Sequence, residues 1–284
     1  MDNSNRRRSF LHNRSLRAGL LALILLSLFA AIAPALSNDP YQVDLSVTLE
    51  PPSSSHLLGT DALGRDVAAR IAYGARVSLG VALMTALLSL LIGAPLGVAA
   101  GYRGGWIDAI VSRCIESVAC IPTLLLAISL LAVSPASLRQ LPDVLRVAIV
   151  LAFGGWIPVA RYLRGEFMRL RSSALVESAR ASGAGEWRIV VHHLLPAAMA
   201  PIWVTAAFAA AAAIMVEAVL SFLGLGVQPP QPTWGGLLSE AREQINSGWW
   251  LALTPGLALF LSVWGFNQLG EGLRQWQDPR STRR

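Results

Sequence analysis

Long apolar runs separated by short polar segments are the dominant pattern along the chain. A helix that crosses a lipid bilayer needs about 20 mostly apolar residues, and six runs reach that length. Because lipid offers no partner to backbone N–H and C=O groups, each run is predicted to be a helix. The predicted spans are Ala18–Asn38, Val77–Ala100, Ser117–Leu138, Val144–Leu163, Pro201–Gly226 and Trp249–Gly270. The pattern therefore predicts an all-α polytopic membrane protein with six transmembrane helices.

The first span has a second interpretation, because it also resembles a secretory signal peptide. It has a basic start that includes Arg14 and Arg17, an apolar run, and Ala33-Pro34-Ala35 as a possible cleavage site. The apolar run continues to Asn38, which is long for a signal core and long enough to cross the bilayer. We therefore expect a retained span over residues 18–38, with cleavage as the alternative.

Charge is scarce in this chain and unevenly distributed. Only 14% of the residues are charged, against about 25% in a soluble domain. All 23 basic residues are arginine, and most of them fall in segments that share one side of the membrane if residues 1–17 are cytoplasmic. The positive-inside rule then places the tail 274–284 in the cytoplasm and the loop 39–76 outside. The net charge of +6 is explained by this bias and does not indicate a nucleic-acid partner.

A glycine- and aspartate-rich turn is predicted near the end of the exterior loop. Its residues are Gly59, Asp61, Gly64, Arg65 and Asp66. The spacing is typical of a tight turn that leads into a helix, with Asp66 near the helix start. A capped re-entry into the membrane is the simpler interpretation, and a docking surface is the alternative.

Two features inside the spans indicate a tightly packed bundle. Gly93, Gly97 and Gly101 recur every four residues, which permits close contact between helices, within the chain or between subunits. Glu217 is the one acidic residue deep within a span, and a carboxylate there is costly. It is predicted to face the bundle interior or a water-filled path, where it either forms an intersubunit hydrogen bond or contacts substrate.

The segment 164–200 is too long for a simple connection between two neighbouring helices. It contains two amphipathic stretches separated by Gly183 and Gly185, and the second stretch is predicted to end at Pro196. The apolar residues expected to form the two buried faces are Phe167, Leu170, Ala174, Leu175 and Ala179, then Trp187, Val190, Val191, Leu194 and Leu195. Such faces need something to pack against. The alternatives are the lipid surface and a partner protein, and the glycine turn favours the partner.

The chain offers no set of residues suited to catalysis, cofactor binding or metal binding. Its four histidines form no ligand pattern, and Cys114 and Cys120 are predicted to be packing residues on different helix faces. A nucleotide-binding P-loop requires a lysine, and the sequence contains none. The polypeptide is therefore not expected to be an enzyme, to carry a metal or cofactor, or to hydrolyse ATP itself.

The long segment also carries a resemblance to a known family. Glu177-Ser178-Ala179, Gly183 and Leu195-Pro196 match five of the seven defined positions of EAA-x3-G-x9-I-x-LP, the signature of ABC importer permeases. Ser178 and His193 depart from it. The stretches "LLGTDALGRDVAARIAYGARVSLG" and "EAVLSFLGLGVQPPQPTWGGLL" resemble the C-type permease subunit of dipeptide, oligopeptide and nickel importers.

This resemblance implies a permease core over 77–273, in which the segment 164–200 is a coupling loop. By the same resemblance, Glu177, Ser178, Ala179 and Gly183 form the docking turn for an ATPase, and Leu195-Pro196 return the chain to the membrane. The implied partners are a homologous permease subunit, two cytoplasmic ATPase subunits and an external binding protein, all at the bacterial inner membrane. The alternative function is an ion-coupled secondary transporter, which would need paired half-repeats and buried ionisable groups. Di- or oligopeptides are the leading substrate that the resemblance implies, and nickel, glutathione and other small solutes are left open.

Overall fold

A computed structural model describes residues 13–36 and 39–277, and within these ranges the chain is helical. The α-helices are α2 (Arg14–Leu36), α3 (Val67–Arg103), α4 (Gly105–Ala119), α5 (Thr123–Ala132), α6 (Ala136–Arg139), α7 (Asp143–Leu170), α8 (Ala174–Ala181), α9 (Glu186–Ile189), α10 (Leu195–Phe222), α11 (Trp234–Glu243) and α12 (Trp249–Gln277). A 3-10 helix η1 (Leu45–Val47) and a π-helical turn η2 (Val190–Leu194) complete the set.

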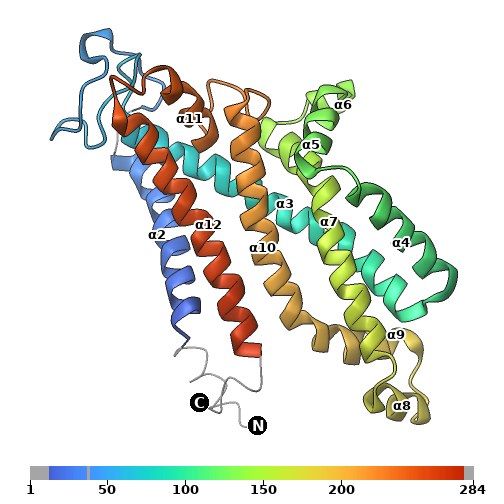
Figure 1. Ribbon diagram of the computed structural model, residues 1–284. Coiled ribbons are helices and arrows are strands. Elements are labelled where there is room, and N and C mark those ends of the chain that lie inside the picture. The colour runs from blue at the N-terminus through green and yellow to red at the C-terminus, as the bar shows by residue number, and fades with distance from the viewer. Residues whose placement is uncertain (1–12, 37–38, 278–284) are drawn as a thin grey trace.

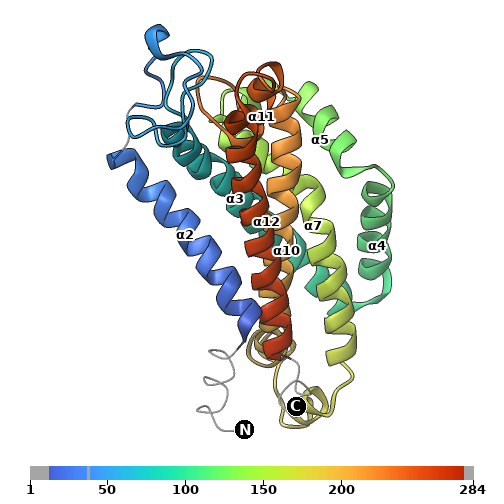
Figure 2. The same ribbon diagram turned by 60° about the vertical axis from the view of Figure 1, so that its left-hand side comes forward.

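The long helices form a bundle with two distinct ends (Figures 1 and 2). At one end lie α8 and α9, together with the start of α2 and the last turn of α12; we call this the arm end. At the other end, the loop end, lie the segment 39–66, α6 and α11. Helix α3 crosses the bundle obliquely behind α12 and α10. Its 37 residues correspond to roughly 55 Å, well beyond the hydrocarbon thickness of a bilayer.

Among the described residues, five helices are long and apolar enough to cross a membrane, and they coincide with five of the six predicted spans. They are α2, α3, α7, α10 and α12. The largest cluster of buried side chains joins four of them, α2, α3, α10 and α12, with Trp234 of α11 fully buried among them. The predicted all-α polytopic fold is thus confirmed.

The third predicted span, Ser117–Leu138, is not a single helix. It is divided between α4 and α5, which meet at an angle of 86°. The break falls at Cys120–Pro122, because a proline has no N–H to donate and disfavours helical backbone in the residue before it. Cys114 and Cys120 lie on α4 and at this break, and both are exposed free thiols. The prediction that they are packing residues was therefore wrong.

Several predicted boundaries also need correction. Helix α3 begins at Val67, at the helix start predicted beside Asp66, so the loop before it ends ten residues earlier than the predicted 39–76. Helix α7 continues past Leu163 to Leu170, and α10 already begins at Leu195. The connection between them is therefore Arg171–Leu194, shorter than the predicted 164–200, and we call it the arm. Charged residues such as Arg164 ended the apolar pattern but did not end the helix.

The glycine strip of α3 packs against α7 within the same chain. A Cβ added to Gly93 would lie 2.5 Å from the carbonyl oxygen of Trp156, and one added to Gly97 would lie 2.6 Å from that of Ala160. Gly101 approaches Arg164 in the same way. The predicted close helix contact is confirmed, and it is an intrachain contact.

The first span is packed closely onto the last one. Gly19 of α2 approaches the backbone of α12 so closely that a Cβ would lie 2.5 Å from the nitrogen of Leu269. Gly272 of α12 meets Leu16 in return, and the Asn13 amide donates to the Gly272 carbonyl at 3.1 Å. Small residues permit this approach of two backbones, which van der Waals contact then stabilises.

An arginine of α3 holds the loop end of α2. The Nε atom of Arg76 donates to the carbonyl oxygen of Ala30 at 2.6 Å, and its Nη2 donates to that of Ala31 at 3.2 Å. Residue 34 of α2 is proline, so the N–H that would normally pair with the Ala30 carbonyl does not exist. Arg76 therefore supplies the hydrogen bond that Pro34 cannot, and its charge also favours a helix C-terminus.

Substitution of Arg76 by glutamine is expected to destabilise the protein through this carbonyl. The cost of an unpaired buried acceptor is about 1–3 kcal/mol, which would appear as a lower thermal unfolding midpoint in detergent. In a Pro34→Ala background the new N–H can pair with Ala30, so the same Arg76→Gln change should cost much less. An equal loss in both backgrounds would contradict this account of Arg76.

Candidate functional site

The arm folds as two short helices joined by a glycine turn, as its sequence predicts. Helix α8 leads to the turn at Ser182–Gly185, and α9 follows and runs directly into η2 and α10. The residues that anchor the arm are Val176, Ile189 and Leu194, which are buried against Leu163 and Phe167 near the end of α7. The arm is therefore packed on the bundle and is not a free loop.

The buried face of the arm agrees with the predicted one only in part: Phe167, Leu194 and Ala179 pack in it as predicted, but other positions differ. Phe167 and Leu170 belong to α7, because the chain turns at Arg171–Ser173 before α8 begins. This turn shifts the helical register, so Val176 faces inward and Leu175 is 52% exposed. In the second stretch Ile189 is buried, whereas Trp187 is 79% exposed.

Gly183 ends α8 in a conformation that favours glycine. Its φ is +79°, and its N–H donates to the carbonyl of Arg180 at 2.9 Å. The N–H of Ala184 donates to the carbonyl of Ala179 at 3.0 Å. Together these two bonds form the Schellman pattern of a helix C-terminus. A Cβ added to Gly183 would meet no described atom within 4 Å, so its surface is open to a partner.

Two of the three signature residues of α8 face away from the bundle. Glu177 and Ser178 are exposed and Ala179 is partly buried. The Ser178 hydroxyl donates to the Leu175 carbonyl at 3.0 Å, so it is held against its own helix. With Trp187 and Leu175, these residues give the arm an outward face that is partly apolar and is left uncovered by this chain.

Pro196 does not end the second stretch, contrary to the prediction. Leu195 is partly buried and Pro196 is exposed, and both lie in the first turn of α10. Just before them the hydrogen-bond ladder widens, and the Leu195 N–H donates to the Val190 carbonyl. This π-turn lets the helix pass a residue that cannot donate, so the arm and α10 are continuous.

The predicted exterior turn is observed at the loop end, where Asp66 caps α3. Its Oδ1 accepts a hydrogen bond from the Ala69 N–H at 2.9 Å, and its Oδ2 lies 3.0 Å from His56 Nδ1. The Oδ1 of Asp61 accepts from the N–H groups of Leu63 and Arg65 at 2.8 and 3.0 Å. The two aspartates point inward, which agrees with the capped re-entry.

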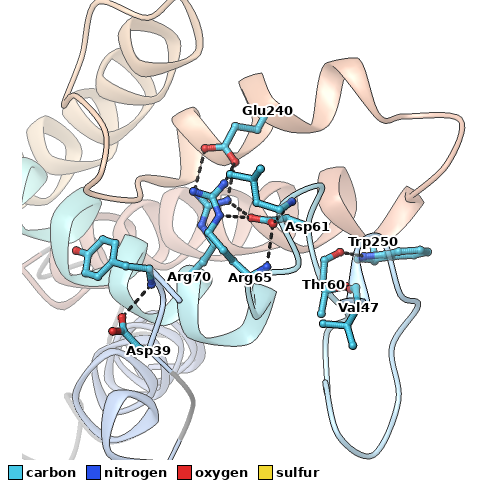
Figure 3. Close-up of polar contacts among 10 residues, drawn as sticks. Asp39, Val47, Thr60, Asp61, Arg65, Arg70, Glu240 and Trp250 are labelled. Atoms are coloured by element: carbon cyan, nitrogen blue, oxygen red, sulfur yellow. Dashed lines mark hydrogen bonds and ion pairs between the residues drawn. The ribbon is translucent and has the colours of Figure 1, made fainter. Parts of the chain in front are cut away.

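A network of four charged side chains fastens this turn to α3 and α11 (Figure 3). Arg70 donates to Asp61 at 2.6 Å and to both oxygens of Glu240, at 2.5 and 2.8 Å. Arg65 also bridges the two acids, at 2.7 Å to Asp61 and 3.0 Å to Glu240. The Arg70 side chain is only 4% exposed, so its interactions with these partners must offset the cost of burying its charge. A cavity of about 360 Å³ lies beside the network.

Both glycines of the turn are required by their backbone and by close neighbours. Gly59 and Gly64 have φ values of +76° and +70°. A Cβ on Gly59 would lie 2.6 Å from the Glu50 carbonyl oxygen and 2.7 Å from Trp250 Nε1, and one on Gly64 would collide with the backbone of Asp44. Trp250 itself donates to the Thr60 carbonyl at 3.2 Å (Figure 3). The turn is thus fixed against α12 as well.

Sequence reasoning missed Arg70, Glu240 and Trp250 as members of this site. Arg70 follows Asp66 by one helical turn, so a side-chain partner in the turn could have been suspected. Glu240 and Trp250 lie far along the chain, and their positions follow only from the packing of α11 and α12 on α3.

Glu217 is fully buried within this chain, so it lies on neither an exposed intersubunit surface nor an open path. Its Oε1 accepts a hydrogen bond from the Ser221 hydroxyl at 2.7 Å. Its Oε2 has no hydrogen bond of good geometry among the described residues, although the hydroxyls of Ser78 and Thr233 lie beside the carboxyl group. The structure therefore assigns it to the contact between α10, α3 and the start of α11, and corrects the intersubunit and pathway interpretations.

No group of three or more metal-ligating side chains is present among the described residues. The two candidate functional sites are the arm at one end of the bundle and the charged network at the other, and the long helices join them (Figure 1).

Comparison with known proteins places the chain in a family. Residues 93–283 match the model of the binding-protein-dependent transport system inner membrane component, and residues 5–52 match the N-terminal TM domain of oligopeptide transport permease C. The chain belongs to this family and is a membrane-spanning permease component of an ABC importer. The family implies an ATPase and a binding protein as partners, and nothing in the comparisons supports the ion-coupled alternative.

Individual relatives match over nearly the whole chain. The dipeptide transport system permease protein DppC of Alkalihalophilus pseudofirmus is 39% identical over 94% of this chain and 86% of its own length. The glutathione transport system permease protein GsiD of Pectobacterium atrosepticum is 38% identical over 96% and 89%. The oligopeptide transport system permease protein OppC of Bacillus subtilis is 35% identical over 95% and 87%.

The fold is also that of a solved transporter. A chain of the inward-facing MetNI methionine ABC transporter superposes with a TM-score of 0.62 over 74% of this chain and 97% of its own, at 19% identity. The type I importer fold inferred from the resemblance is thus confirmed.

Substitution of Glu217 by glutamine is expected to leave the protein stable and active. Glutamine keeps an acceptor for Ser221 and adds a donor for the neighbouring hydroxyls. Glu217→Ala removes the acceptor as well as any donor and leaves the neighbouring hydroxyls unpaired. It should lower the free energy of unfolding by about 1–3 kcal/mol, seen as a lower unfolding midpoint. If Glu217→Gln abolished uptake without loss of stability, the charge of Glu217 would have a direct part in transport.

Proposed function

We propose that this chain is one of two homologous permease subunits of an importer for di- or oligopeptides. Relatives at 35–39% identity bear the names of dipeptide and oligopeptide permeases, and GsiD is named for glutathione, itself a tripeptide. An external binding protein would deliver the peptide and two cytoplasmic ATPase subunits would drive its passage, without ATP hydrolysis by this chain. The observation that carries the proposal is the arm, which is packed on the bundle and leaves the signature residues Glu177, Ser178 and Gly183 exposed.

The distribution of arginine supports a cytoplasmic arm end. Arg103, Arg161, Arg169, Arg180 and Arg188 gather there and are all exposed. At the loop end, Arg65 and Arg70 are paired with Asp61 and Glu240, so these two arginines contribute less to the net positive charge of that end. The positive-inside rule then favours cytoplasmic N- and C-termini and an exterior position for the segment 39–66.

The exposed face of the arm is suited to a groove in an ATPase. Trp187 gives it a large apolar side chain of the kind that dominates binding energy at interfaces. Gly183 permits close approach beside it, because no side chain covers the turn. At the opposite end, the charged network and Trp250 hold the exterior turn in one position, where a binding protein could contact it together with α11.

Loss of this chain is expected to abolish the part of the cell's peptide uptake that depends on this importer. In a deletion strain, uptake of labelled dialanine and trialanine should fall to the level of the remaining transporters, while uptake of free alanine is unchanged. A plasmid copy of the gene should restore it. Normal peptide uptake with loss of another solute, such as nickel, would reject the peptide assignment and keep the importer.

Substitutions at Gly183 separate backbone strain from docking. Gly183→Ala adds a Cβ at positive φ, which costs about 1–2 kcal/mol, but it contacts nothing, so uptake should be nearly normal. Gly183→Arg adds the same strain and a bulky charge on the open surface. It should keep normal membrane levels and lose about tenfold or more of the co-purifying ATPase, the equivalent of 1.4 kcal/mol of binding. Equal ATPase recovery with both variants would show that the arm is not the docking element.

A further inference from the structure

Helix α4 is attached to the side of the bundle and is the first half of the broken span (Figure 2). It packs on α3 and α7 through Val111 and Ile115, while Trp106 and Ile110 on its other face are exposed. After the 86° break at Cys120–Pro122, α5 packs on the loop-end half of α7, through contacts such as Ala127 with Val147. The two halves of the span are thus held by different parts of the molecule.

One ion pair ties α4 to the arm-end part of α7. The guanidinium of Arg164 donates through Nε to one oxygen of Asp108 and through Nη2 to the other, the second at 2.9 Å. Such a two-point contact fixes orientation as well as distance. The side chains are 31% and 20% exposed, so the pair is partly shielded from water.

The same part of α7 carries the arm. Leu163 and Phe167, which precede and follow Arg164 by one and three positions, are fully buried against Val176, Ile189 and Leu194. A side chain of the arm's first residue, Arg171, also reaches the junction of α3 and α4, where its Nη1 would lie 2.7 Å from a Cβ added to Gly104. One stretch of α7 therefore contacts the arm on one side and α4 on the other.

We propose that the Asp108–Arg164 pair makes α4 move together with the arm. The bend at Cys120–Pro122 then accommodates the movement of α4 relative to α5. A displacement of the arm by the ATPase would then reach the broken span through this pair. The pair positions α4 during the transport step and contacts neither ATP nor peptide. This inference rests on the proposed role of the arm in docking the ATPase.

Asp108→Asn tests the pair in the assembled importer, because it removes the charge and keeps the shape. We expect the ATPase to co-purify in normal amount and to hydrolyse ATP, while peptide uptake per ATP hydrolysed falls about tenfold, the equivalent of about 1.4 kcal/mol. Asp108→Glu, which keeps the carboxylate, should retain most of the uptake. The matched control is Glu116→Gln, which breaks the exposed Arg113–Glu116 pair on the same helix and should change nothing.

Two outcomes would overturn the inference. If uptake per ATP hydrolysed is unchanged in Asp108→Asn, the pair does not transmit the movement of the arm to α4. Loss of the ATPase from the Asp108→Asn complex would show that the pair serves docking or folding instead. A failure of the proposed docking role itself would appear separately, as full ATPase recovery and uptake with Gly183→Arg.

Discussion

The close contact between α3 and α7 is the constraint on which the rest of the molecule depends. Lipid gives helices little hydrophobic reason to associate, so their contact relies on backbones that can approach. Gly93, Gly97 and Gly101 provide that approach, with carbonyl groups of α7 where side chains would otherwise stand. Helix α3 begins at the glycine- and aspartate-rich turn and α7 leads into the arm, so this one glycine strip connects the loop end of the bundle with the arm end.

Proline has three different effects in this chain, and its surroundings decide which one occurs. Pro122 lies at the break of a span, where α4 and α5 meet at a bend of 86°. Pro196 is accommodated by a π-turn that moves the hydrogen-bond ladder by one residue. Pro34 remains within α2, where Arg76 pairs with the carbonyl that it leaves free. A proline in an apolar run therefore predicts a disturbed ladder, but the compensation comes from tertiary structure.

The sequence was sufficient for five of the six spans, the glycine turn of the arm and the helix start at Asp66. Each of these depends on local composition or on backbone geometry that few residues can adopt. The buried face of α8 was misassigned because the turn at Arg171–Ser173 shifts the helical register, and no residue there marks the shift strongly. Partners such as Glu240 for Arg70, and Ser78 for Glu217, come from helices distant in sequence, so only the assembled bundle reveals them.

The exposed thiols of Cys114 and Cys120 make the broken span observable in the native sequence. The chain has two cysteines, one on the last turns of α4 and one at the break, and both are free. Spin labels or fluorophores attached to them would report on the last turns of α4 and on the start of the bend without any engineered residue. The protein thus provides its own pair of spectroscopic probes, at the point where its two half-helices meet.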